Sequence, residues 1–82
     1  MLKIEKYGNN HCSACKQAEV AMRKFSHDIE YVDTDANMDR ARNANVISLP
    51  TYIVYRGTEE VGRICGYTPN IMGRILDLVE QV

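Results

Sequence analysis

The order of apolar and polar residues predicts short strands. Apolar and polar positions alternate over residues 2–7, which is the pattern of a half-buried strand. Residues 29–33 and 51–55 are rich in β-branched and aromatic side chains, as strands usually are. Residues 56–59 supply turn chemistry, so residues 60–65 can return as the hairpin partner of the strand before them.

A first helix is predicted after the first strand, which ends at Gly8, Asn9 and Asn10. It should run from Ser13 to about Phe25 or Ser26, because its apolar residues recur at helical spacing. These residues are Ala18, Ala21, Met22 and Phe25.

Two further helices are expected later in the chain. One should continue through residues 40–44, with Thr34 or Asp35 as its cap. The other should begin with Thr68 as N-cap and Pro69 in the first helical position. Their apolar faces consist of Met38 and Ala41 in the former, and of Ile71, Met72, Ile75, Leu78 and Val79 in the latter.

These elements follow one another in the order β-α-β-α-β-β-α. Strand-helix-strand units favour right-handed crossovers and parallel pairing, whereas the last two strands should form an antiparallel hairpin. The predicted fold class is therefore α/β, with a mixed four-stranded sheet that carries helices on both faces.

Composition narrows the classes of function. The chain has 82 residues, with ten basic and eleven acidic side chains and a net charge of −1. We expect a single domain over residues 1–82, and the balance of charge disfavours nucleic-acid binding or coating of an anionic membrane. No apolar stretch approaches the roughly 18 residues that span a bilayer, and the first residues do not resemble a signal peptide. We therefore expect a cytoplasmic protein, and a monomer.

The three cysteines are too few and too unevenly spaced for a disulfide scaffold. Cys12 and Cys15 form a C-x-x-C pair at the point where a loop enters the first helix, while Cys65 stands far along the chain. A thiolate is the attacking form of cysteine, and the N–H groups and dipole at a helix start stabilise a negative sulfur. Cys12 is placed to attack a disulfide, and Cys15, one helical turn later, is placed to resolve the product.

Such a pair has three other possible uses. The pair can supply half of a zinc site, but the other ligand candidates, His11, His27 and Cys65, are isolated in the sequence. The two cysteines can also be inert core residues. Haem attachment requires a histidine directly after the pair, where Lys16 stands. The strand before the pair and the helix after it favour the redox interpretation.

The C-x-x-C pair and two later features together resemble a known family, and the resemblance covers essentially the whole chain. The sequence Cys12-Ser13-Ala14-Cys15, the strand entry at residues 49–51 and Gly66 after the hairpin are similar to the thioredoxin superfamily. The chain is of glutaredoxin size. The resemblance implies a thioredoxin fold and a protein-disulfide reductase that needs no cofactor beyond a redox-active disulfide between Cys12 and Cys15. It also implies a nucleophilic Cys12, a resolving Cys15 and a cis peptide bond at Pro50.

The same resemblance implies where a substrate peptide would bind. Leu49 would offer its backbone N–H and C=O to an extended peptide, next to Pro50 and Thr51. Gly66 would keep the binding groove open, and Tyr67 would flank it. Disulfide-containing proteins such as ribonucleotide reductase would be the electron acceptors.

The source of electrons separates the subclasses. Glutaredoxins hold glutathione with an acidic pair after the glycine, but Tyr67 and Thr68 occupy that region here. Residues 66–70 instead resemble the redoxins that serve ribonucleotide reductase, which take electrons from thioredoxin reductase. Thioredoxin reductase is therefore the preferred donor and glutathione the alternative. A non-enzymatic zinc-binding or interaction module is a further alternative.

Other side chains near the pair receive smaller roles. The buried acid of thioredoxins is replaced by Lys6, which could favour a thiolate if it points toward Cys15, although a strand lysine more often extends to solvent. His11 and Lys16 could also favour a thiolate, or be exposed without a role. Tyr7 could flank the groove, with core packing as the default. Cys65 is expected to be a buried strand residue rather than a third redox thiol.

Overall fold

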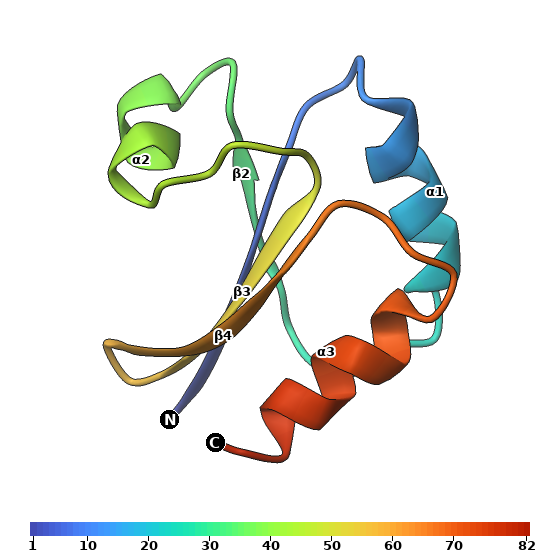
Figure 1. The fold of residues 1–82 in the computed structure, drawn as a ribbon, viewed down its shortest axis with the longest axis vertical. Coiled ribbons are helices and arrows are strands. Elements are labelled where there is room, and N and C mark those ends of the chain that lie inside the picture. Colours follow the sequence, from blue (N-terminus) through green and yellow to red (C-terminus); the bar gives the residue numbers. More distant parts are fainter.

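The computed structural model describes all 82 residues and shows the predicted order of elements (Figure 1). Both chain termini lie at the end of the sheet opposite the start of the first helix (Figure 1). No helix has the length and apolar character needed to cross a membrane. The elements are β1 (Leu2–Gly8), α1 (Ser13–Ala21), β2 (Glu30–Asp33), α2 (Met38–Asn43), β3 (Thr51–Arg56), β4 (Glu59–Cys65) and α3 (Ile71–Val79).

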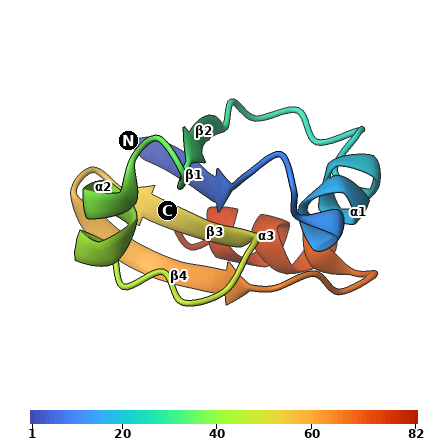
Figure 2. The ribbon, with the colours of Figure 1, turned by 90° about the horizontal axis from the view of Figure 1, so that it is seen from above.

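The four strands form one mixed sheet in the order β2-β1-β3-β4. β1 runs parallel to β2, whereas the β1–β3 and β3–β4 pairs are antiparallel. Helix α2 covers one face of the sheet, while α1 and α3 lie together on the other (Figure 2). This arrangement confirms the predicted fold class.

Alternation along the strands divides the core into two clusters. On β1, Ile4 belongs to the cluster that faces α1 and α3, and Tyr7 belongs to the cluster that faces α2. Ile71 and Ile75 of α3 are fully buried in the first cluster, as their helical spacing predicts. Burying these apolar faces on both sides of the sheet is the main driving force for the fold.

The first helix ends earlier than the apolar pattern predicts. Helix α1 stops at Ala21, and the chain continues in turns in which Phe25 N–H donates to the Met22 carbonyl. Ala18 and Met22 are buried, and Phe25 still packs against the same core cluster. The apolar spacing persists past the helix because these turns keep Phe25 on the core side, so spacing alone cannot locate the end.

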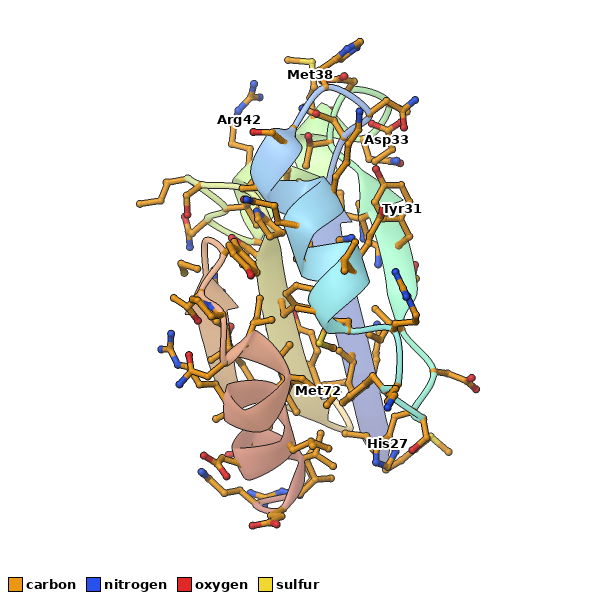
Figure 3. The ribbon with its side chains drawn as sticks, turned by 90° about the vertical axis from the view of Figure 1, so that its right-hand side faces the viewer. His27, Tyr31, Asp33, Met38, Arg42 and Met72 are labelled. Atoms are coloured by element: carbon orange, nitrogen blue, oxygen red, sulfur yellow. The ribbon has the colours of Figure 1, made fainter.

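The predicted cap of α2 is wrong. The N-cap position is Asn37, because the Thr34 hydroxyl donates to the Gly8 carbonyl and Asp35 N–H donates to the Asp33 carboxylate instead. The predicted apolar face of α2 is only half right. Ala41 is buried, but Met38 in the first turn is exposed (Figure 3).

The predicted start of the last helix is wrong as well. Helix α3 begins at Ile71 with Asn70 in the N-cap position. Thr68 and Pro69 form a turn before it, closed by the Ile71 N–H donating to the Thr68 carbonyl. The Thr68 hydroxyl donates to the Asn70 side chain. Proline at the second position of a turn is as favourable as at the start of a helix, which explains the error.

Candidate active site

Cys12 occupies the N-cap position of α1. Its backbone is extended there, and its Sγ accepts a hydrogen bond from the Cys15 backbone N–H at 3.1 Å. The sulfur thus takes the place of the side-chain oxygen that usually caps a helix. This N–H and the helix dipole both stabilise negative charge on Cys12.

Cys15 lies in a different environment from Cys12. Cys15 is only 2% exposed, whereas Cys12 is partly accessible. Burial and the neighbouring Cys12 raise the pKa of the Cys15 thiol to about 11, although the Asn9 backbone N–H and the Lys6 charge act in the opposite direction. The pair is therefore asymmetric, with an accessible sulfur at the helix start and a protonated sulfur beneath it.

Gly8 makes room for the buried sulfur. A Cβ atom at Gly8 would lie 3.1 Å from Cys15 Sγ, which is tighter than ordinary van der Waals contact. The absence of a side chain at the end of β1 therefore allows α1 to approach the sheet at the cysteine pair. The sequence pattern predicts Gly8 only as the end of a strand, because a glycine there is equally typical of a turn.

The start of β3 lies at the same end of the sheet as the end of β1. Tyr7 of β1 pairs with Thr51, and Thr51 in turn pairs with Cys65 of β4. The Leu49–Pro50 peptide bond directly before β3 is cis, as the resemblance implies. The Pro50 carbonyl accepts the Gly66 N–H at 2.7 Å, and Gly66 has a positive φ of 82° that favours glycine. The residues predicted to bind substrate thus lie at the same end of the sheet as the cysteines.

Lys6 is buried on the face of the sheet that α1 covers. It is 6% exposed, so the expectation that this lysine extends to solvent is wrong. Its ammonium lies 3.4 Å from the Glu19 carboxylate and 5.8 Å from the ring centroids of Tyr31 and Tyr52. Figure 3 shows Tyr31 on β2 beside α1. Glu19 and Tyr31 were not predicted to belong to the site, because only the register of the sheet reveals that they meet.

The remaining predicted residues lie around this centre in different ways. His11 and Lys16 are exposed, and His11 N–H donates to the Asn9 side chain. Tyr67 is partly buried against the core cluster of α1 and α3. Tyr7 is a core residue whose hydroxyl donates to Glu5, so it does not flank the site. Cys65 is exposed, which contradicts the prediction of a buried cysteine.

Two hollows mark the surface. One, of about 390 Å³, opens beside the cysteine pair and is lined by Asn9, Asn10, Lys16, Glu19 and Tyr31. The other lies over residues 35–42, away from the cysteines. Neither is lined by Leu49 or Gly66. Nowhere in the structure do three histidine, cysteine, aspartate or glutamate side chains come close enough together to hold a metal ion.

Comparison with known proteins points to one family, although no family model matches the chain. It is 35% identical over 63 residues to Thioredoxin-2 of Saccharomyces cerevisiae, which covers 71% of this chain and 61% of that protein. It is 33% identical over 70 residues to Thioredoxin H2-1 of Oryza sativa subsp. japonica, covering 79% of this chain and 51% of that protein. The chain thus spans between about half and three fifths of the length of these relatives.

A solved structure agrees with these relatives. The crystal structure of thioredoxin from Trypanosoma brucei brucei superposes with a TM-score of 0.84 over 98% of this chain and 76% of that one, at 24% identity. At this identity the likeness establishes the fold. The chain has a C-x-x-C pair at the start of α1 and a cis Leu49–Pro50 bond, and two thioredoxins are its sequence relatives. The chain belongs to the thioredoxin superfamily.

Proposed function

We propose that the protein is a thiol-disulfide oxidoreductase that reduces protein disulfides through Cys12 and Cys15. The observation that carries the proposal is the asymmetry of the pair. Cys12 is accessible and its sulfur accepts a helix N–H, whereas Cys15 is buried directly beneath it. One sulfur is therefore suited to attack an external disulfide, and the other can reach only its partner.

The exchange takes two steps. The Cys12 thiolate attacks one sulfur of the substrate disulfide, forming a mixed disulfide and releasing the second substrate sulfur as a thiolate, which takes a proton from water. Cys15 then loses its proton to water and attacks Cys12. The Cys12–Cys15 bond forms, the mixed disulfide breaks, and its electron pair leaves on the first substrate sulfur, which is protonated in turn. Two electrons pass to the substrate, so no metal or organic cofactor is required.

We propose that the substrate backbone binds beside the pair. Leu49 is partly exposed directly before Pro50, and Ile47, at 93% exposed, presents an apolar side chain close by in the sequence. An extended peptide that pairs with the Leu49 backbone would bring its disulfide toward Cys12. Thr51, which follows Pro50, and Gly66, which donates to the Pro50 carbonyl, lie next to this proposed position, with Tyr67 the next residue in the chain.

The first test measures reduction of insulin disulfides with dithiothreitol as the electron source. The wild-type protein should accelerate the reduction, and Cys12→Ser should abolish the acceleration. Cys65→Ser is the matched control because this third cysteine is exposed and lies outside the pair. A Cys12→Ser variant that still accelerates the reaction would overturn the proposed activity.

We further propose that the pair takes its electrons from thioredoxin reductase. Tyr67 and Thr68 stand where glutaredoxins carry the acidic residues that hold glutathione, which supports this choice. The oxidised protein should consume NADPH rapidly with thioredoxin reductase and slowly with glutathione and glutathione reductase. Rapid consumption in the glutathione system alone would overturn this choice and leave the disulfide reductase activity intact.

A further inference from the structure

The charge nearest the buried cysteine comes from β1. Lys6 and Gly8 stand two residues apart on this strand, so both face α1. Cys15 Sγ lies over Gly8, and the ring of Tyr31 approaches both Gly8 and the Lys6 ammonium. The buried sulfur and the buried ammonium therefore share one compartment between β1 and α1.

The Lys6 ammonium has favourable partners on three sides. Tyr31 and Tyr52 pair with Lys6 on the two neighbouring strands and present their rings to its ammonium. A cation over an aromatic face is stabilised by the electrons of the ring. Glu19 supplies the opposite charge from α1, and its side chain is 63% exposed at the rim of the 390 Å³ hollow. The Lys6 ammonium is thus fixed in position.

We propose that Lys6 is a positioning residue whose charge stabilises the Cys15 thiolate in the second step of the exchange. This inference rests on the proposed disulfide reductase function. It deepens that function because an ammonium cannot accept the Cys15 proton and can only stabilise the negative sulfur. The Cys15 proton then leaves to water, and Lys6 acts as a fixed positive charge beside the sulfur.

Every other titratable group that faces Cys15 has to be considered. Glu19 on α1 places negative charge nearby and opposes a thiolate at Cys15, whereas the Cys12 sulfur is neutral in this step because it is bonded to the substrate. Tyr52 on β3 and Tyr31 on β2 are neutral near neutral pH, because burial raises the pKa of each phenol. Lys6 is therefore the positive side chain in this compartment that offsets the cost of burying the Cys15 thiolate.

The experiment separates the two steps by their colour change. Each reduced protein, in a Cys65→Ser background, is mixed with one equivalent of the chromogenic disulfide dithionitrobenzoate. The attack by Cys12 releases one coloured thiolate, and closure of the Cys12–Cys15 bond releases the second. The rates of both phases are recorded as a function of pH by stopped-flow absorbance.

Lys6→Met should slow the second phase about tenfold at neutral pH and move its pH midpoint up by about one unit, since one pKa unit is a tenfold change in thiolate population. The first phase should change by less than about threefold. Glu19→Gln removes the opposing charge and should move the midpoint in the opposite direction. Lys3→Met is the matched control, because Lys3 lies on the same strand but pairs with Glu5 on the other face.

Four outcomes would contradict the inference or its basis. An unchanged second phase in Lys6→Met overturns the role of Lys6 and leaves the proposed function standing. The role of Lys6 is also overturned if Lys6→Met and Glu19→Gln shift the pH midpoint of the second phase in the same direction. If Lys6→Met does not fold, a Glu19→Gln variant that shifts this midpoint upward or not at all overturns the role instead. If the wild-type protein releases only the first thiolate, the proposed function fails, and the inference fails with it.

Discussion

The backbone N–H of Cys15 donates to the sulfur of Cys12 at 3.1 Å, while the side chain of Cys15 is buried beneath that sulfur. One residue therefore contributes to both steps of the proposed exchange. Its N–H stabilises the first thiolate, and its own sulfur attacks in the second step. The helix start fixes both relationships, because the capping geometry places the third helical N–H at the N-cap side chain.

The close approach at Gly8 predicts a cost for adding a single methyl group. In Gly8→Ala the new Cβ would lie 3.1 Å from Cys15 Sγ, so the sulfur or α1 has to move. Overpacking of this kind usually costs about 1–3 kcal/mol of unfolding free energy. We expect a loss in this range in urea denaturation of the reduced protein, together with slower closure of the Cys12–Cys15 bond.

Gly73→Ala is the matched control for this change. A Cβ at Gly73 meets nothing within 4 Å, and the residue lies within helix α3. Alanine favours a helix over glycine by up to about 1 kcal/mol, so this variant should be slightly more stable than the wild type. Equal effects of the two substitutions would show that the contact between Gly8 and Cys15 is not tight.

The buried carboxylate of Glu5 predicts a dependence of stability on pH. Burial alone would raise the pKa of Glu5, but hydrogen bonds from Arg40, Tyr7, Tyr55 and Lys3 outweigh it and hold the pKa below the usual value. A lowered pKa contributes stability above the unfolded value of about 4.3, and this contribution is lost as the pH falls through the folded pKa. Acid should therefore destabilise the wild-type protein.

Arg40→Met tests this cluster, because Arg40 donates to Glu5 at 2.7 Å and bridges to Glu30 at 2.9 Å. We expect a loss of about 1–2 kcal/mol at pH 7, since Arg40 is half exposed, and a loss that shrinks as the pH falls through the lowered pKa of Glu5. Urea denaturation over a series of acidic pH values measures it. Arg42→Met, whose partner Asp39 is fully exposed, should cost less than about 0.5 kcal/mol. A loss that does not shrink in acid would contradict the assignment.

Arg63 connects β4 to the segment that leads to Pro50. Its guanidinium binds Glu60 with two hydrogen bonds of 2.7 Å and donates to the Ala44 carbonyl at 2.9 Å. Arg63→Met should loosen residues 44–50 and raise KM for insulin by about threefold to tenfold, as expected for about 1 kcal/mol of lost hydrogen bonding. The kcat should change little.

Arg56→Met is the control for this prediction. Arg56 pairs with Glu59 at 2.6 Å and donates to the Gln81 carbonyl, but it lies at the other end of the hairpin, far from Pro50. Its KM should stay at the wild-type value. A rise in KM in both variants would indicate a general loss of hairpin stability. It would contradict a specific role of Arg63 in holding residues 44–50 next to the proposed substrate position.

The strands and their order along the chain were predictable from the sequence, because burial on one or both faces imposes a local pattern of apolar residues. The helix boundaries at Ala21 and Ile71 were not, because the competing turns have the same apolar spacing and the same proline chemistry. The caps proposed at Thr34 and Asp35 failed for a different reason. The Thr34 hydroxyl bonds to Gly8 across the sheet, a contact that depends on the register of two strands.

In the site as well, features set by local sequence were predictable and features set by contacts between distant segments were not. Cys12 and Cys15 were found because three-residue spacing at a helix start is local information. The burial of Lys6 was not predictable, since it depends on Tyr31, Tyr52 and Glu19, which come from three different elements. Cys65 is exposed because it is the last residue of an edge strand, a position that only the strand order reveals.

If Cys12 attacks first and Cys15 resolves, the mixed disulfide should accumulate when Cys15 is removed. Reduced Cys15→Ser and Cys12→Ser, both in a Cys65→Ser background, are mixed with insulin and analysed by non-reducing intact-mass spectrometry. We expect a stable covalent adduct at Cys12 in the Cys15→Ser protein and none in the Cys12→Ser protein. An adduct in the Cys12→Ser protein, or no adduct in either, would contradict this order of attack.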